Sequence, residues 1–430
     1  MGEASNNHFV MLHTRDQDLD LGGFVPLDLG ESHYVAVNVH LNPHIVMGPI
    51  GKLKMTSRRA EIAGAGIAGM SAAVRLAQLG WDVVLHERND DVRAFGAGIW
   101  LWENGLKSLE ILGAYDATVA RAKIIKEWRL VDEDGEVMFS RPAPSDRFLL
   151  PPRADLYQAL FDRATAEGVE IRTQSNAVEA KPEGVLVMES GEERAADLIV
   201  AADGAYSRIR NKLLATSWID FGIEAGIRTM IGYEPGDPDE VVTEYINGAY
   251  RLLYNPCTDG ENYIFLSAPI GSDAARQYPI DRNAWKSKFP HCAHLIDRLT
   301  EASRWDQVLN VRARFWSTGK IALLGDCAHA MPPNLGQSAN MAMTNAMALA
   351  ARVNESQDVP SALVEWERRH RPLTDHVQWW SYIYGLFLGK WPTRFMGLRT
   401  DAIQTIANTK WFDRGLNKGA RHVPDGYEYK

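Results

Sequence analysis

A glycine-rich stretch between Ala60 and Arg88 constrains the fold of this chain more than any other feature. It reads AEIAGAGIAGMSAAVRLAQLGWDVVLHER, where a short apolar run leads into glycines at GxGxxG spacing, a helix-period segment and a second apolar run. Gly64 permits a tight turn, Gly66 lets the backbone approach a pyrophosphate, and Gly69 lets helix and strand pack closely. The pattern predicts a βαβ unit that binds a dinucleotide at a helix N-terminus.

The end of the second apolar run supports this interpretation. Glu87 follows the glycines by about 20 residues, where an acid accepts the hydroxyls of an adenosine ribose. Gly80 stands where the helix is expected to end. Glycines also mark ordinary turns, but an ordinary turn does not require strand, helix, cap and acid in this order.

The composition is that of a globular protein, and it excludes several classes of function. The 430 residues are 46% hydrophobic and 23% charged, and the formal net charge is −9 with a pI near 5.8. Such a chain has no basic field to hold nucleic acid or an anionic membrane. Cys257, Cys292 and Cys327 lack the spacing of a zinc site or a disulfide framework. We therefore expect a cytoplasmic protein without a metal, a nucleic-acid partner or a membrane span.

The sequence pattern divides the chain into four parts. Residues 1–54 alternate weakly without a convincing helix, and we expect a dispensable extension, either upstream of a true start at Met55 or packing on a partner. A nucleotide domain occupies residues 55–220 and resumes over 316–430 with C-terminal helices. Residues 221–315 change to period two and predict an antiparallel substrate domain. The fold class is therefore α/β, a Rossmann-like domain interrupted by an antiparallel sheet.

Further apolar strands of the nucleotide domain end in an acid. One leads into Asp203-Gly204 and another into Gly325-Asp326. Acids at the carboxyl edge of parallel strands tend to line the ligand crevice. Arg93 among small residues suits a backbone beneath a flat or phosphorylated ligand, with a solvated arginine as an equal alternative. His329 follows Asp326 closely, and we expect it to pack or cap a helix rather than to act as a base.

A hairpin signal around Asp259 organises the predicted substrate domain. If the hairpin closes there, residues of equal parity face the same way, so Arg251, Asn255, Tyr263 and Phe265 share one surface. A cation, an amide, a phenol and a ring on one face suit a small aromatic acid. A solvated sheet face is an equally weighted alternative.

Three ordered motifs resemble those of the FAD-dependent aromatic hydroxylases of the p-hydroxybenzoate hydroxylase type. They are GAGIAG with Glu87-Arg88, then Ala202-Asp203-Gly204, then Gly325-Asp326-Cys-Ala-His329 before a proline-rich loop. The resemblance runs from Arg58 to Pro372. Within this group, RRAEIAGAGIAG, RAFGAGIWLWENGL, RLLYNPC and WERRHRP look most like the oxygenases of hydroxypyridine carboxylates.

The resemblance implies roles for individual residues. Glu87 would hold the adenosine ribose of FAD, and Asp326 would bind the ribityl chain or the pyrophosphate. Arg93 and Arg153 would contact the cofactor, and the loop from Pro332 would lie beside the isoalloxazine. The full set that the resemblance assigns to FAD is Gly64, Gly66, Ala68, Gly69, Glu87, Arg88, Arg93, Arg153, Val178, Asp203, Asp326, Gly336, Ala339 and Asn340. The set that it assigns to substrate and catalysis is Arg228, Arg251, Tyr263, Trp100 and Pro332.

This sequence departs from the group's pattern in two places. Trp100 stands where a tyrosine is expected, and Gln337-Ser338 replaces the more usual Gln-Gly. Because the larger ring of Trp100 cannot donate a phenolic hydrogen bond, it reshapes the pocket and leaves the identity of the substrate open.

The implied activity is monooxygenation. NADH or NADPH would reduce FAD, and O2 would form a flavin C4a-hydroperoxide that hydroxylates a small aromatic or pyridine-type hydroxy acid. Plain hydroxylation, ring opening and assembly into a homo-oligomer all stay open. A nicotinamide-dependent dehydrogenase would share the GxGxxG but would leave the acids at Asp203 and Asp326 unexplained. A non-oxygenating FAD-binding protein is the other alternative.

Overall fold

The computed structural model describes most of the chain beyond residue 56. The described ranges are 57–91, 97–143, 147–220, 224–272, 277, 279–300, 304–389, 398–407 and 409–428. Before them, the backbone is described for the antiparallel strands β1 (Phe9–Thr14), β2 (Pro26–Asp28) and β3 (His33–Asn38). The predicted cofactor residue Arg93 lies outside the described residues.

The first residues form a compact unit of their own. Contacts divide the chain into Met1–Thr56 and Ser57–Lys430. Deletion of residues 1–54 is therefore expected to leave the flavin content and the activity of the purified protein unchanged, because the second unit holds its own hydrophobic cores. The measurement is flavin absorbance per chain and turnover of both forms. Loss of soluble protein on deletion would show that the segment is structural.

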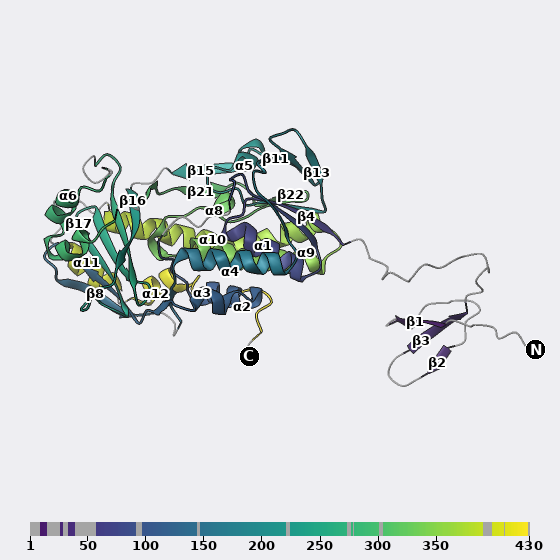
Figure 1. Ribbon diagram of the computed structural model, residues 1–430, viewed down its shortest axis with the longest axis horizontal. Coiled ribbons are helices and arrows are strands. Elements are labelled where there is room, and N and C mark those ends of the chain that lie inside the picture. Colours follow the sequence, from purple (N-terminus) through teal and green to yellow (C-terminus); the bar gives the residue numbers. More distant parts are fainter. Residues whose placement is uncertain are drawn as a thin grey trace, which may run out of the picture. The chain divides into compact units, whose positions relative to one another are not determined.

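A six-stranded sheet forms the centre of the predicted nucleotide domain (Figure 1). Its order is β10-β5-β4-β14-β23-β22, and all neighbours are parallel except the last pair. Its strands are β4 (Arg59–Ala63), β5 (Asp82–His86), β10 (Glu170–Arg172), β14 (Leu198–Ala201), β22 (Ser317–Thr318) and β23 (Ile321–Leu323). The parallel strands direct their carboxyl ends to the same edge, as the sequence predicted.

The crossover from β4 to β5 has the predicted form. Helix α1 (Ile67–Gln78) buries most of its apolar side chains between α4 (Arg153–Ala166) and α9 (Ser338–Glu355). Gly64 has a φ of +101°, and a Cβ on Gly69 would lie 1.9 Å from the carbonyl oxygen of Gly64. Both glycines are thus required by backbone geometry and close packing, whether or not a ligand is bound.

A second, seven-stranded sheet carries the predicted substrate domain. Its order is β20-β16-β19-β18-β17-β7-β8. Its strands are β7 (Glu127–Val131), β8 (Val137–Pro142), β16 (Glu224–Gly232), β17 (Val241–Asn247), β18 (Tyr250–Pro256), β19 (Glu261–Pro269) and β20 (Arg304–Gln307). The pairing of β7 with β17 is parallel, so this sheet also takes in a hairpin from before residue 221. The domain boundaries that the sequence suggested, at residues 220 and 315, remain predictions.

The hairpin register predicted around Asp259 is confirmed. Arg251 pairs with Ser267, Leu253 with Phe265, and Asn255 with Tyr263. One face of the sheet packs on α6 (Arg282–Lys288) and α7 (Ala293–Asp297), and the opposite face belongs to a separate aromatic cluster. Because both faces are covered, the alternative of a solvated sheet face does not hold for this hairpin.

The remaining elements are short strands and helices around the two sheets. The strands are β6 (Lys123–Ile124), β9 (Leu149–Leu150), β11 (Ala177–Lys181), β12 (Val185–Met188), β13 (Glu193–Ala195), β15 (Thr216–Asp220) and β21 (Asn310–Ala313). The helices are α2 (Glu103–Leu112), α3 (Tyr115–Val119), α5 (Arg208–Lys212), α8 (Asp326–His329), α10 (Val359–Gly389), α11 (Arg399–Ala407) and α12 (Lys410–Asn417), with 3-10 turns η2 (Pro290–Cys292) and η3 (Pro333–Leu335).

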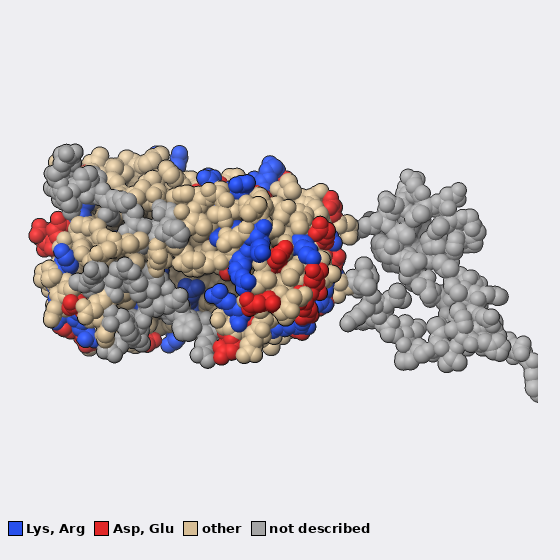
Figure 2. All heavy atoms as spheres, turned by 90° about the horizontal axis from the view of Figure 1, so that it is seen from above, with Lys and Arg blue, Asp and Glu red and all other residues tan. Residues whose placement is uncertain are grey.

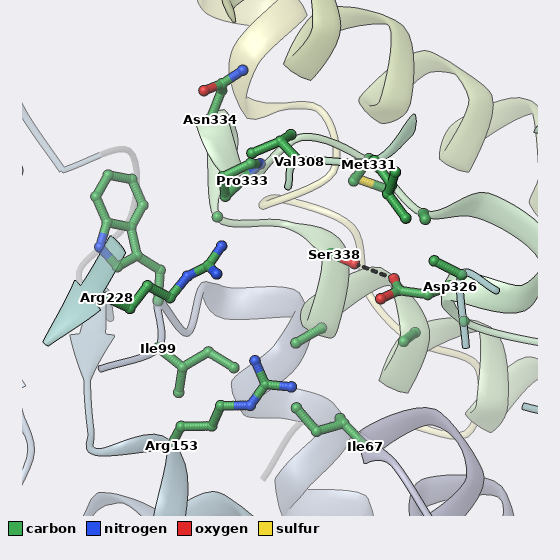
Figure 3. A pocket seen from close by; sticks show the side chains of 18 of the residues that line it. Ile67, Ile99, Arg153, Arg228, Val308, Asp326, Met331, Pro333, Asn334 and Ser338 are labelled. Carbon is green, nitrogen blue, oxygen red and sulfur yellow. Dashed lines mark hydrogen bonds between the residues drawn. The ribbon is translucent and has the colours of Figure 1, made fainter. Parts of the chain in front are cut away.

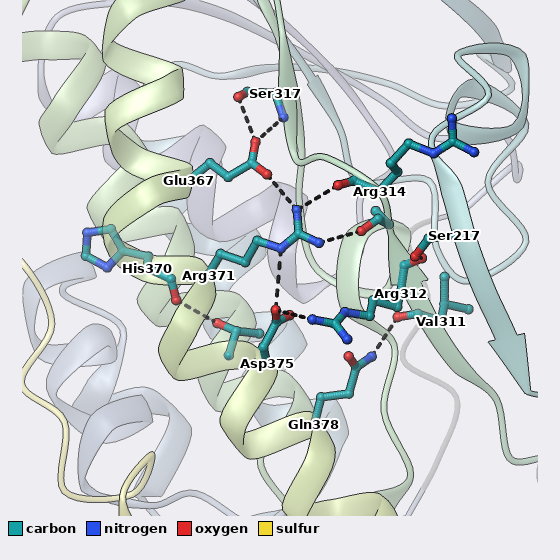
Figure 4. Close-up of polar contacts among 12 residues, drawn as sticks. Ser217, Val311, Arg312, Arg314, Ser317, Glu367, His370, Arg371, Asp375 and Gln378 are labelled. Carbon is teal, nitrogen blue, oxygen red and sulfur yellow. Dashed lines mark hydrogen bonds and ion pairs between the residues drawn. The ribbon is translucent and has the colours of Figure 1, made fainter.

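Helix α10 is tied to the backbone near β21 (Figure 4). Arg371, from the WERRHRP segment, donates to the carbonyls of Ala313 and Arg314 at 2.8 and 2.9 Å and pairs with Glu367 at 2.7 Å. Gln378 donates to the carbonyl oxygens of Val311 and Ala330. The segment therefore fixes the helix against the chain that leads into the loop after α8.

The surface carries both signs of charge. On the face in Figure 2, Lys and Arg lie interspersed with Asp and Glu. Within the described ranges, no helix is both long enough and apolar enough to cross a bilayer.

Candidate active site

The three acids predicted at the sheet edge border two cavities that share part of their lining. One, of about 210 Å³, is lined by Glu87 and Asp203, and the other, of about 430 Å³, is lined by Asp326. Both are bordered by Gly66 and by the backbone around Gly204. The carboxyl ends of β4, β5, β14 and β23 thus meet two adjoining cavities, together called the crevice below, at the edge where an open α/β sheet binds its ligand.

Glu87 is held at the end of β5 by backbone contacts. Its Oε2 accepts from the Ala65 N–H at 3.1 Å, inside the glycine-rich turn. Its Oε1 accepts from the N–H and the side-chain amide of Asn89 at 3.0 and 2.6 Å. These bonds fix the carboxylate between the first turn and the loop after β5, where a ribose hydroxyl can reach the remaining lone pairs.

The larger cavity has the features that a dinucleotide requires. A Cβ on Gly66 would meet a single neighbouring atom, the Tyr157 hydroxyl at 3.8 Å, so the turn leaves room above it. Arg153 opens α4 and reaches into the pocket (Figure 3), and its buried Nε has no hydrogen-bond partner among the described residues. Asp326 accepts from the Ser338 hydroxyl at 2.9 Å. Open space, an unsatisfied guanidinium and a fixed carboxylate fit a phosphorylated sugar chain.

The far end of this cavity is aromatic. The ring of Trp100 packs edge-on against Trp102, Trp128 and Phe148, with centroids 5.1 to 5.8 Å apart. Its Nε1 donates to Asn255 Oδ1 at 2.7 Å. A Cβ on Gly336 would lie 2.7 Å from this ring, so the loop passes directly against it. The indole N–H of Trp100 is therefore already bonded to Asn255, and the part of the ring that lines the cavity is apolar.

Polar side chains from the seven-stranded sheet complete this end. Arg228 points into the pocket (Figure 3), with its guanidinium 5.2 Å from the centroid of the Phe265 ring. Burial raises the pKa of Tyr263, and the nearby charge of Arg228 opposes that shift. Tyr263 is therefore protonated at neutral pH and available as a hydrogen-bond donor.

Arg251 is neutralised by a residue that the sequence analysis missed. Its Nη2 lies 2.5 Å and its Nε 2.7 Å from Glu244 Oε1, and both side chains are buried. Asn334, on the loop after α8, accepts from Arg251 Nη1 at 2.6 Å. The dipeptide Asn247-Gly248, a hairpin signal, would have placed Glu244 directly opposite Arg251. In the structure Asn247 pairs with Tyr250, so the turn lies one residue later and Glu244 is the diagonal neighbour of Arg251.

Most predicted site residues border the crevice. Those that line one or both cavities are Gly64, Gly66, Ala68, Glu87, Arg88, Trp100, Arg153, Asp203, Arg228, Arg251, Tyr263, Asp326, Gly336 and Ala339. Val178 follows the lining residue Ala177. Pro332 lies between Met331 and Pro333, which line the pocket, and its carbonyl accepts from Ser381.

Asn340 and Gly69 act through the backbone. The Asn340 side chain donates to the carbonyls of Trp100 and Gly336 and accepts from the Trp102 N–H, so it holds the loop at Gly336 against the segment from Trp100 to Trp102.

His329 has the packing environment that the sequence analysis expected. Its ring is buried beside Trp316, and its Nε2 lies 3.1 Å from the Asn345 amide. Burial lowers the pKa of His329 to about 4. An imidazole with a pKa this far below neutral binds a proton too weakly to be an effective general base at neutral pH.

The same shift makes stability depend on pH. Because the folded pKa of about 4 lies below the ordinary 6.5, the unfolded chain binds more protons between these values. The free energy of unfolding is expected to fall as pH decreases through this window, and His329→Gln should flatten that part of the profile. Urea unfolding at a series of pH values measures the slope. An equal slope in both proteins would contradict the assignment to His329.

The crevice and the aromatic pocket that opens from it define a flavin-dependent class of enzyme, and comparison with known proteins identifies it. The chain belongs to the FAD-binding domain family, whose sequence profile matches residues 59–358. The fold class and the resemblance drawn from the motifs are thereby confirmed, and the protein is an FAD-dependent monooxygenase.

The chain is similar to several proteins that are named for a reaction. A Mycobacteroides abscessus 2-heptyl-3-hydroxy-4(1H)-quinolone synthase is 37% identical over 344 residues, covering 76% of this chain and 90% of that protein. A Rhodococcus erythropolis protein named for the same reaction is 39% identical over 330 residues, covering 75% and 86%. The tetrameric form of 2-methyl-3-hydroxypyridine-5-carboxylic acid oxygenase superimposes with a TM-score of 0.77 at 34% identity, covering 87% and 99%.

Proposed function

We propose that this monooxygenase uses NADH or NADPH and O2 to hydroxylate a small N-heteroaromatic ring that carries a hydroxyl or ring-oxo group. The observation that supports it is the larger cavity, which runs without interruption from Gly66 and Asp326 to the polar wall of Arg228 and Tyr263. A flat substrate ring bound at that wall would share the cavity with the flavin ring of FAD.

The proposed FAD contacts follow the crevice. Glu87 accepts from the adenosine ribose, and the N-terminus of α1 at Gly66 faces the pyrophosphate. Arg153 and Asp326 bind the phosphate and ribityl part, from opposite sides of the pocket (Figure 3). The loop from Pro333 to Gly336 lies beside the isoalloxazine.

The reaction needs little covalent chemistry from the chain. When bound, FAD would supply the redox chemistry: two electrons would pass from the nicotinamide to O2, one oxygen atom would be added to the ring, and the other would become water. Tyr263 donates to the ring oxygen of the substrate, and the charge of Arg228 stabilises negative charge on that oxygen, whether it is an ionised hydroxyl or the polarised oxygen of a neutral ring-oxo group. Trp100 and Phe265 pack on the ring and keep water out.

The walls favour a neutral heterocycle over a ring acid. Trp100 offers no donor to the cavity, and the charge of Arg251 is paired with Glu244. Two relatives are named as synthases of a 4(1H)-quinolone, which is a ring of this kind. A hydroxy acid of the pyridine carboxylate type is the second candidate, and the observation that favours it is the guanidinium of Arg228 in the pocket.

A substrate panel tests the proposal. Purified, flavin-loaded protein is mixed with NADH or NADPH, and nicotinamide consumption is followed with 4-quinolones, hydroxypyridines and hydroxylated ring carboxylates. A quinolone is expected to stimulate nicotinamide consumption at least about tenfold, because a few polar contacts to a ring change its binding by about this factor. Product mass separates addition of one oxygen atom from ring opening. Colourless protein that cannot be loaded with FAD would favour a dehydrogenase, and consumption that no ring affects would favour a non-oxygenating FAD protein.

We also propose that the chain forms a homo-oligomer. The solved pyridine-carboxylate relative is described as tetrameric, and Trp379 and Trp411 expose 60% and 65% of their surface on the C-terminal helices. The molecular mass in solution, from light scattering, decides this point.

A further inference from the structure

The hairpin of β17 and β18 buries a carboxylate in the wall of the substrate pocket. Glu244 exposes 1% of its surface and Arg251 3%, and both border the larger cavity. Oε1 of Glu244 accepts from Arg251 Nε at 2.7 Å and lies 2.5 Å from its Nη2. The pair has no net charge, so this wall attracts anions far less than the arginine alone would.

The other oxygen of Glu244 keeps acceptor capacity. Oε2 accepts from the Tyr384 hydroxyl of α10 at 3.0 Å. Burial and the neighbouring carboxylate raise the pKa of Tyr384 well above its usual value, so this phenol stays a donor. A carboxylate oxygen has two lone-pair positions. Oε2 can therefore take one more hydrogen bond from a donor that enters the pocket.

The support around the pair fixes its geometry. Arg251 Nη1 donates to Asn334 Oδ1, and the Asn334 amide donates to the Ser381 carbonyl of α10 at 2.9 Å. A Cβ on Gly385 would lie 2.4 Å from this amide, so the helix approaches the loop closely. The carboxylate is held from three elements, and a buried acceptor held this firmly discriminates strongly between ligands with and without a matching donor.

We propose that Glu244 determines substrate specificity: its Oε2 accepts a hydrogen bond from the ring N–H of a lactam-type heterocycle, and its charge cancels Arg251 so that no substrate carboxylate binds at this wall. The proposal rests on the proposed function and names the recognition group within that site. A substrate carboxylate placed here would be repelled by Glu244, because both would pair with the same guanidinium. A ring without an N–H donor would leave the second lone pair of Oε2 without a hydrogen bond.

Binding to the flavin-loaded full chain tests this without turnover. The probes are 4(1H)-quinolone, its N-methyl analogue and 4-hydroxyquinoline-2-carboxylate, and dissociation constants come from the change in flavin absorbance. The wild-type protein is expected to bind the N–H ring about tenfold or more tightly than the N-methyl ring. In Glu244→Gln this ratio should fall to within about threefold, and affinity for the carboxylate should rise at least about fivefold.

Glu240→Gln is the matched control. Glu240 precedes the same strand and pairs with Lys126 on the surface, so both ratios should stay at the wild-type values. If Glu244→Gln purifies without flavin, the double variant Glu244→Gln/Arg251→Gln, which also removes the unpaired charge, should lose the N–H preference and gain no carboxylate affinity.

The outcomes separate the two levels of the proposal. An unchanged N–H to N-methyl ratio in Glu244→Gln, or wild-type protein that binds none of the probes, overturns the role of Glu244. Wild-type protein that binds the N–H ring selectively but consumes no nicotinamide with any ring overturns the proposed function and leaves the recognition by Glu244 standing.

Discussion

Arg251→Met is expected to destabilise the folded protein by about 3–5 kcal/mol, because it leaves the buried carboxylate of Glu244 without its partner. Chemical denaturation of the flavin-loaded protein measures the change. The apparent substrate constant should also rise, because Asn334 loses the donor that positions it.

A double variant separates the lost charge pair from lost packing. Arg251→Met/Glu244→Gln removes the uncompensated charge, so it should recover at least half of the stability lost in the single variant. Arg228→Met should lower the free energy of unfolding much less. Arg228 is a cation of the same pocket, but it lies beside the ring of Phe265, so its removal does not strip a buried carboxylate of its partner. A double variant as unstable as Arg251→Met would show that shape, and not charge, sets the cost.

Glu87→Ala is expected to weaken FAD binding roughly 10- to 100-fold, the range for loss of a charged hydrogen-bond acceptor. The carboxylate also accepts from the Ala65 N–H and from Asn89, so the glycine-rich turn and the loop after β5 both lose their link. The measurement is the flavin that remains bound after gel filtration, together with titration of the apoprotein.

Glu170→Ala provides the comparison for this prediction. Glu170 belongs to β10, the neighbour of β5, and pairs with Arg172 on the surface. This variant should retain its flavin. Equal flavin content in Glu87→Ala and Glu170→Ala would remove Glu87 from the cofactor site.

Local patterns were sufficient to predict much of the fold. Parallel strands that end in Glu87, Asp203 and Asp326 must meet at one sheet edge, so the crevice followed from three separate segments. The hairpin around Asp259 fixed which residues share a face, because strand parity has a period of two.

Longer-range pairings could not be predicted in this way. The parallel pairing of β7 with β17 joins segments about a hundred residues apart, and nothing local to either strand encodes it. The contact of Tyr384 with Glu244 likewise needed the packing of α10. The contact of Glu244 with Arg251 is local, but the Asn247-Gly248 signal locates that turn only to within one residue. Pro332 and Asn340 lie in the motifs that the sequence singled out. The Pro332 carbonyl accepts from Ser381 and the Asn340 amide donates to the Trp100 carbonyl, so both bond to protein groups around the pocket.

Helix α10 connects the backbone around β21 with the wall of the substrate pocket. Near its middle, Arg371 and Gln378 bind the backbone around β21, and one to two turns later Ser381 and Tyr384 bind the pocket loop and Glu244. A substitution that shifts the helix at Arg371 would therefore move the groups that recognise the ring without altering any of them. Variants selected in the laboratory for a new ring should accumulate along this helix as well as among the residues that touch the substrate.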